Sequence, residues 1–219
     1  MVSHACRIDP PDGEELGAMW NLTEEEIRAE VGARLSTARM AHTERMAETA
    51  ASLASLFGGD PGAARIAGLL HDWARETPPA ALLCEARARG LAVDAVEARE
   101  PLLLHGKVAA SWATERFGLT DPELLAAVVH HIVGAPGMSR LAQVVFLADF
   151  IEPGRPYPAA ARAREAVRRG LHEALAIAYD AVITHVVTHG YLLHPRTLEA
   201  RNELLLYRAE PVARLEEDP

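Results

Sequence analysis

Apolar side chains recur with helical spacing along most of the chain. Between Met40 and Phe57, for example, they stand three or four residues apart, which places them on one face of an α-helix. Upstream, Thr23 and Glu26 form the sequence pattern of a capping box, which is typical of a helix start. No segment combines alternating polarity with an excess of β-branched residues. The pattern therefore predicts an all-α protein.

Glycine, proline and aspartate divide this helical pattern into separate elements. Gly58 has the place of a helix C-cap, and Asp60 with Pro61 supplies the N-cap and the first position of the next helix. Applied along the chain, such signals predict a single bundle of about nine helices. The predicted helices are one that starts at Thr23 and those over 40–57, 64–73, 77–89, 101–117, 121–133, 139–151, 171–188 and 195–206.

The net charge of the chain limits the classes of binding partner that we expect. The chain has 22 Lys and Arg against 31 Asp and Glu, a formal charge of −9. Since nucleic-acid polymers are bound through basic side chains that neutralise phosphates, no such partner is expected. A small phosphate ligand bound through a metal stays compatible with this charge, because the metal brings positive charge of its own. The basic run Arg162, Arg164, Arg168 and Arg169 is interpreted as the solvated face of a helix.

The sequence shows no pattern typical of a signal peptide or a membrane helix. The first twenty residues hold no apolar stretch of signal-peptide length, and no apolar run approaches the roughly 18 residues of a membrane helix. We therefore expect a cytoplasmic protein without a membrane partner.

Six histidine and aspartate side chains stand inside apolar helical stretches. An ionisable pair such as His71-Asp72, at the end of a buried run, needs a partner or a metal to offset its lost solvation. Imidazole and carboxylate donors without thiolates suit Fe, Mn, Co, Ni or Zn, as one ion or two, in an open catalytic site. The pattern therefore predicts metal-assisted hydrolysis of a phosphoester or phosphoanhydride. The six residues are His42, His71, Asp72, His105, His131 and Asp149.

Their order, His…His-Asp…His…His…Asp, resembles the signature of HD-domain phosphohydrolases. The flanking segments resemble more closely the bacterial YqeK-type proteins, symmetrical diadenosine tetraphosphate hydrolases that bind iron and release two ADP. The resemblance runs from about Leu22 to Tyr207, so 21–210 is interpreted as an HD-type phosphohydrolase domain, 1–20 as an N-terminal extension and 211–219 as a C-terminal tail. The segments that carry it are GLLHDWAR (68–75), LLLHGKVAA (102–110), VVHHIVGAPGMS (128–139), LADFIEPGR (147–155) and HPRTLEARN (194–202).

The resemblance implies a role for each candidate residue. Iron is the implied cofactor, with Mn, Co, Ni or Zn as alternatives, ADP is the implied product, and a homodimer is the implied assembly. The implied metal ligands are His42, His71, Asp72 and Asp149. The implied catalytic residues are Asp72, His105 and His131. The implied substrate-binding residues are Arg39, Arg75, His105, His131, Arg155, His194, Thr197 and Arg201.

One segment departs from the family pattern. Relatives read His-Thr-Thr-Gly-Arg where this chain has His131-Ile132-Val133-Gly134-Ala135, so two hydroxyls and one cation are missing beside the site. This departure leaves room for an HD phosphohydrolase of another nucleotide specificity, such as a nucleotidase or an alarmone hydrolase. A second alternative is a nucleotide sensor without turnover, against which the complete set of six candidate residues argues.

Overall fold

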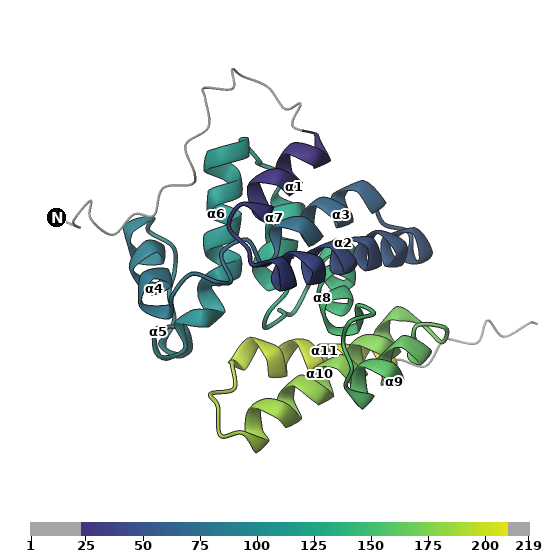
Figure 1. Cartoon of the computed structure of the whole chain (residues 1–219). Helices are drawn as coiled ribbons and strands as arrows, with labels where there is room; N and C mark the ends of the chain where they lie inside the picture. Colours follow the sequence, from purple (N-terminus) through teal and green to yellow (C-terminus); the bar gives the residue numbers. More distant parts are fainter. Residues whose placement is uncertain (1–22, 210–219) are drawn as a thin grey trace, which may run out of the picture.

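The computed structural model describes residues 23–209, and within them helices follow one another without a strand (Figure 1). The all-α prediction is therefore confirmed, although eleven α-helices replace the expected nine or so. The extension 1–20 and the tail 211–219 lie outside the described residues, and the domain bounds stay a prediction. The helices are α1 (Glu24–Gly32), α2 (Thr37–Phe57), α3 (Pro61–Leu70), α4 (Pro79–Ala88), α5 (Ala95–Arg99), the 3-10 helix η2 (Pro101–Leu104), α6 (His105–Phe117), α7 (Pro122–His130), α8 (Arg140–Ile151), α9 (Pro158–Ala166), α10 (Leu171–Thr188) and α11 (Pro195–Ala209).

Side-chain caps set most of these boundaries. The Asp60 carboxylate accepts hydrogen bonds from the first free amides of α3, and Pro61 occupies the first turn, where no amide hydrogen is needed. Thr23 and Glu26 form the predicted capping box of α1. Gly58 ends α2 with φ of 80°, a left-handed conformation that glycine adopts without strain. Local sequence therefore fixes these ends before any tertiary contact forms.

Two observed helices lie outside the nine predicted ranges, and one of them carries part of the arginine run that was interpreted as a solvated helix face. Helix α5 is short, and α9 contains Arg164, whose guanidinium is not solvated as predicted. Arg164 donates hydrogen bonds to the carbonyl oxygens of Ile151 and Glu152, both at 2.7 Å, and of Arg155 at 2.9 Å. These carbonyls lie at the end of α8 and in the turn beyond it, where no helical amide is left to satisfy them. Arg164 thus fastens the turn after α8 to α9.

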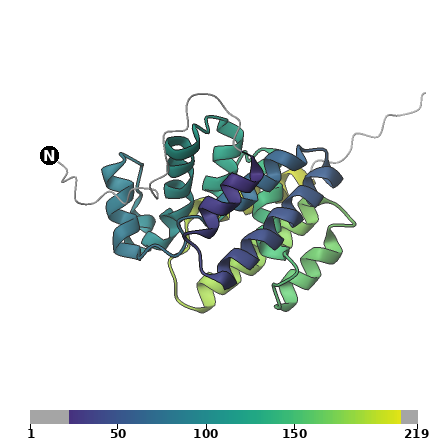
Figure 2. The same ribbon diagram turned by 45° about the horizontal axis from the view of Figure 1, so that its top comes forward.

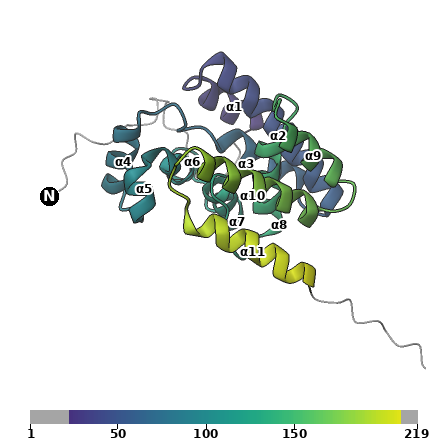
Figure 3. The ribbon, with the colours of Figure 1, turned by 90° about the horizontal axis from the view of Figure 1, so that it is seen from below.

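The helices form two groups in space. In Figure 1, α9, α10 and α11 lie below the group that contains α1–α3 and α6–α8. Figure 3 shows α10 crossing beneath α7 and α8, with α11 beside it, and α10 contacts both α8 and α11. In Figures 1 and 2, α4 and α5 project from the side of the molecule opposite α9. None of the described helices is both long and apolar enough to span a membrane.

The core is built from small side chains, which lets helices approach closely. Ala47, Ala50 and Ala54 of α2 are buried against α3. At the crossing, a Cβ on Gly68 of α3 would lie 2.6 Å from the Cα atom of Ala47. This close approach brings the middle of α2 next to the C-terminal end of α3.

Candidate metal centre

Three of the predicted histidines share one local geometry at helix ends. His71 follows the last residue of α3, His105 begins α6 after η2, and His131 follows α7. In each, ring Nδ1 lies 2.6–2.7 Å from the carbonyl oxygen three residues earlier. Since a carbonyl oxygen only accepts, Nδ1 donates and Nε2 keeps its lone pair. The helices predicted over 64–73, 101–117 and 121–133 were therefore wrong at the functional histidines, where the observed helices end or begin.

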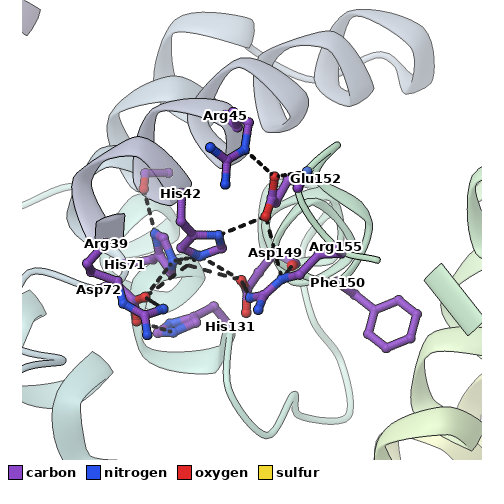
Figure 4. A network of polar contacts seen from close by, with 12 residues as sticks. Arg39, His42, Arg45, His71, Asp72, His131, Asp149, Phe150, Glu152 and Arg155 are labelled. Atoms are coloured by element: carbon purple, nitrogen blue, oxygen red, sulfur yellow. Dashed lines mark hydrogen bonds and ion pairs between the residues drawn. The ribbon is translucent and has the colours of Figure 1, made fainter. Parts of the chain in front are cut away.

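Four imidazoles meet around the Asp72 carboxylate, and Figure 4 labels three of them, His42, His71 and His131. Its Oδ2 atom lies 3.4 Å from His71 Nε2 and 3.7 Å from His42 Nε2. Its Oδ1 atom lies 3.1 Å from His105 Nε2 and 3.9 Å from His131 Nε2. The two oxygens of one carboxylate thus face two different imidazole pairs. The result is two ligand triads that share Asp72, each with ligand atoms within 4.8 Å of one another.

Within each imidazole pair, the two Nε2 atoms face each other. His105 Nε2 lies 3.1 Å from His131 Nε2, and His42 Nε2 lies 3.3 Å from His71 Nε2. Burial and the neighbouring imidazoles of His71 and His105 lower the pKa of His131 to about 3, so this ring is neutral near pH 7. Burial alone would lower the pKa of His71, but the adjacent Asp72 carboxylate raises it. Ring nitrogens at such distances repel each other unless a proton or a metal cation lies between them. The donor set therefore fits one cation at each triad.

Asp149, on α8, adds a further carboxylate to the first triad. Its Oδ1 atom lies 3.1 Å from His42 Nε2 and 4.0 Å from His71 Nε2. It also forms an ion pair with Arg155, which donates a second hydrogen bond to the Asp149 carbonyl oxygen at 2.8 Å. The structure thus brings all six predicted histidine and aspartate residues together at one place.

A cavity of about 560 Å³, here called the first cavity, opens beside this cluster. Arg39, Arg75 and Arg155 line it from α2, from the turn after α3 and from the turn after α8. Arg39 donates to Asp72 Oδ2 at 3.0 Å, whereas the Arg75 guanidinium has no hydrogen bond or ion pair within the part of the chain that the structure describes. Asp72, Glu100 and Asp149 line the same cavity, and Arg39 and Arg155 are paired with Asp72 and Asp149. The guanidinium of Arg75 is therefore the group that favours an anion in this cavity.

A comparison with known protein families identifies the family that has this arrangement of residues. The model of the HD domain matches residues 39–154, which run from α2 to the turn after α8 and include all six cluster residues. The chain belongs to the HD-domain family. Members of this family use divalent metal, and the two triads supply the donors that such an HD metal centre needs.

Similar proteins cover most of this chain. A relative from Halalkalibacterium halodurans, named symmetrical bis(5'-nucleosyl)-tetraphosphatase, is 32% identical over 172 residues, 78% of this chain and 91% of the relative. A relative of the same name from Bacillus subtilis is 30% identical over 188 residues, 84% of this chain and 98% of the relative. A crystal structure from Clostridium acetobutylicum, described as a predicted HD superfamily hydrolase involved in NAD metabolism, has 33% identity and a TM-score of 0.82 over 87% of this chain and 100% of its own.

Glu152 is a residue of the HD site that the sequence analysis missed. It is buried, and Oε1 lies 3.1 Å from His42 Nδ1. Its other oxygen accepts hydrogen bonds from Arg45 Nε and the Gly154 amide. Burial alone would raise its pKa, but hydrogen bonds from Arg45, Gly154 and His42 lower the pKa to about 2. The signal in the sequence was its place three residues after Asp149 in LADFIEPGR.

Removing this carboxylate should weaken metal binding without touching a metal donor. In Glu152→Ala, His42 loses the acceptor that orients its ring, and we expect metal affinity to fall about 10- to 100-fold. Glu152→Gln keeps a carbonyl acceptor for His42 Nδ1 and should restore part of the loss. Metal titration against a competing chelator measures both, with the exposed Glu165→Ala of α9 as control. Unchanged affinity in Glu152→Ala would show that the ring is positioned without this carboxylate.

Three predicted substrate-binding residues lie away from the HD cluster. His194 Nε2 bonds to Asp94 Oδ2 at 2.7 Å, and Arg201 Nε donates to Asp180 Oδ1 at 2.9 Å. Thr197 is buried in the first turn of α11, with only 2% of its surface exposed. None of the three lines the first cavity, so the structure does not bring them to the other predicted residues.

The three residues after His131 that differ from the family pattern also lie in different parts of the structure. Ile132 lines the first cavity, whereas Val133 lines a different hollow beside His194, and Ala135 is buried next to Tyr179. Gly134 between them has φ of 70°, and a Cβ there would lie 2.0 Å from the Tyr179 hydroxyl oxygen. Only Ile132 therefore changes the surface that a ligand beside the cluster would meet.

Proposed function

We propose that this chain is a metal-dependent hydrolase that cleaves dinucleoside tetraphosphates symmetrically, so that diadenosine tetraphosphate and water give two ADP. The observation that carries the proposal is the Asp72-bridged pair of triads beside a cavity lined by three arginines. The names of the relatives from H. halodurans and B. subtilis, which align over most of both chains, support this substrate class.

The two triads divide the proposed metal ligands. His42, His71, Asp72 and Asp149 would hold one ion, and Asp72 with His105 and His131 would hold the second. Divalent ions bound there would supply an activated water for attack on phosphorus and would neutralise phosphoryl charge. We propose iron as the resident metal on the family resemblance, with Mn, Co, Ni and Zn equally compatible with imidazole and carboxylate donors.

The chain's own part in the reaction is to bind and orient the polyphosphate. Arg39, Arg75 and Arg155 would engage phosphate oxygens, for which the planar guanidinium offers paired donors. Hydrolysis joins the water oxygen to one of the two central phosphorus atoms and breaks the bond from that atom to the bridging oxygen. The bridging oxygen leaves on one ADP, the water oxygen stays on the other, and the water protons pass to solvent.

Product analysis tests this function directly. The purified protein, supplied in turn with Fe, Mn, Co, Ni or Zn, is incubated with diadenosine tetraphosphate, and the products are separated by chromatography. We expect ADP as the only nucleotide product, and AMP with ATP would contradict symmetric cleavage. Preferred hydrolysis of a nucleoside monophosphate or a guanosine alarmone in the same assay would favour an HD phosphohydrolase of another nucleotide specificity. The departure from the family pattern at Ile132 is compatible with such a specificity. Tight ADP binding without turnover under every metal would favour a sensor.

Arg75 should contribute to substrate binding through its unpaired guanidinium. A charge-assisted hydrogen bond is worth about 1.5–3 kcal/mol, so Arg75→Ala should lower kcat/KM about 10- to 100-fold. Arg75→Lys keeps the charge but not the paired donors, and should retain part of this activity. Steady-state kinetics measure both, with the exposed Arg87→Ala of α4 as control. Wild-type kcat/KM in Arg75→Ala would remove this residue from the phosphate site.

The remaining expectations concern location and assembly. We propose a cytoplasmic location and a homodimer on the family resemblance. Light scattering after size-exclusion chromatography measures the mass in solution, and a monomeric mass at micromolar concentration would contradict the homodimer.

A further inference from the structure

A second cavity of about 460 Å³, lined in part by His131 and Asp149, adjoins the histidine and aspartate cluster. Both cavities are lined by His131, Ile132, Asp149 and Arg155, so they meet at these four residues. Beyond this junction, the second cavity runs between α8, α9 and α10. A ligand that passes the cluster at the junction could therefore reach into both cavities at once.

The linings of the two cavities differ in the number of charged groups. The first holds Arg39, Arg75, Asp72 and Glu100 in addition to the shared Asp149 and Arg155, whereas Arg155 is the only arginine among the described residues that line the second. The second is lined mainly by aromatic and aliphatic side chains, and the polar groups that it does not share with the first cavity are Tyr157 and His185. Such a lining suits a nucleoside with one phosphate at the junction better than it suits a polyphosphate.

Two aromatic rings form one wall of the second cavity. The ring centroids of Phe150 and Tyr157 lie 5.4 Å apart, at an angle of 57°. The Tyr157 hydroxyl donates to the Phe150 carbonyl oxygen at 3.3 Å, which holds the two rings together. Both side chains are half-buried, and Figure 4 shows the Phe150 ring pointing away from the histidines, on the far side of Arg155.

The aromatic wall is rigidly connected to the cluster. Phe150 follows Asp149 directly on α8, and Arg155 precedes Tyr157 by two residues in the turn that Arg164 fastens to α9. A base stacked on these rings would therefore stand at a fixed distance from Asp149 and Arg155. An aromatic platform accepts any base, since every base presents a π face.

We propose that the second cavity binds one nucleoside of the substrate, with its base against Phe150 and Tyr157 and its adjoining phosphates at Arg155. The other half of the dinucleotide then lies in the first cavity, and the middle of the polyphosphate lies at the cluster. The inference rests on the proposed function and adds to it a reason for symmetric cleavage: a nucleoside on each side of the cluster centres the chain of phosphates on it.

The test compares two substrates that differ by one nucleoside. Phe150→Leu keeps an apolar side chain but removes the ring, and Phe150→Tyr keeps the ring as the conservative variant. For diadenosine tetraphosphate, Phe150→Leu should raise KM about 10-fold with little change in kcat, and Phe150→Tyr should restore KM. For adenosine 5'-tetraphosphate, which can lie in the first cavity alone, KM or the inhibition constant should change less than about 2-fold.

The outcomes separate this inference from the proposed function. Equal changes for both substrates in Phe150→Leu, or no change for either, would overturn the second-nucleoside site while symmetric hydrolysis by the wild type still stood. Failure of the wild type to hydrolyse diadenosine tetraphosphate would overturn the proposed function itself. Thermal unfolding and metal content of both variants, measured in parallel, show whether the fold and the cluster are intact.

Discussion

Replacing Asp72 by asparagine should abolish turnover and metal binding together. Among residues 23–209, Asp72 is the only one whose two oxygens face both imidazole pairs, so its loss removes a donor from both triads. Metal ions contribute several kcal/mol of transition-state stabilisation, and about 1.4 kcal/mol corresponds to a tenfold change in rate. We therefore expect kcat/KM to fall more than about 1000-fold, with less than one tenth of the wild-type metal content by elemental analysis.

A matched variant controls for the chemistry of the change. Asp121→Asn makes the same substitution at the N-cap of α7, where asparagine caps as well as aspartate, and should leave metal content and turnover unchanged. Thermal unfolding of both variants reports whether the fold survives. Full metal content and turnover in a folded Asp72→Asn protein would refute the bridging role.

Substituting Gly68 by alanine should destabilise the protein and disturb the cluster at once. The new Cβ would lie 2.6 Å from the Cα atom of Ala47 and 3.1 Å from the Sδ atom of Met46. Because the closest contact is with backbone, α2 and α3 must separate, and His42 then moves relative to His71. Overpacking of this kind costs about 3 kcal/mol at the upper end of its usual range, which should lower Tm by about 6–12 °C.

Another helical glycine provides the comparison. A Cβ on Gly32 of α1 would meet nothing closer than Met40 Sδ at 3.8 Å, an ordinary contact. Gly32→Ala should therefore leave Tm unchanged or raise it slightly, since alanine favours the helix. Calorimetry and metal content measure both variants. Equal Tm values for the two would mean that the crossing of α2 and α3 adjusts without cost.

The six cluster residues could be predicted because buried ionisable groups within apolar helical stretches require a common partner. Glu152 could not, because its role depends on a contact with His42, 110 residues earlier in the chain. Similarly, Arg164 resembled any exposed arginine on a helix until its three carbonyl partners were known. Both cases are contacts between different elements of the fold, which the local pattern within one helix does not encode.

The helix boundaries show a second limit of prediction from the sequence. Apolar spacing continues past Leu70 and His130, so periodicity alone extended those helices through His71 and His131. The chain continues in turns after both histidines, and each ring donates to a backbone carbonyl oxygen at the helix end. Helical spacing of apolar residues does not register this change, which falls at residues that gather around Asp72.

The Nδ1–carbonyl bonds at three helix ends bear on how quickly the protein takes up its ions. Each of these imidazoles already has its tautomer and its orientation before any ion arrives, so loading needs no ring flip and no proton exchange between the two nitrogens. The slow event is then the loss of water from the incoming cation. Uptake should accordingly rank by the lability of each metal's hydration shell, with nickel slower than manganese, iron or zinc.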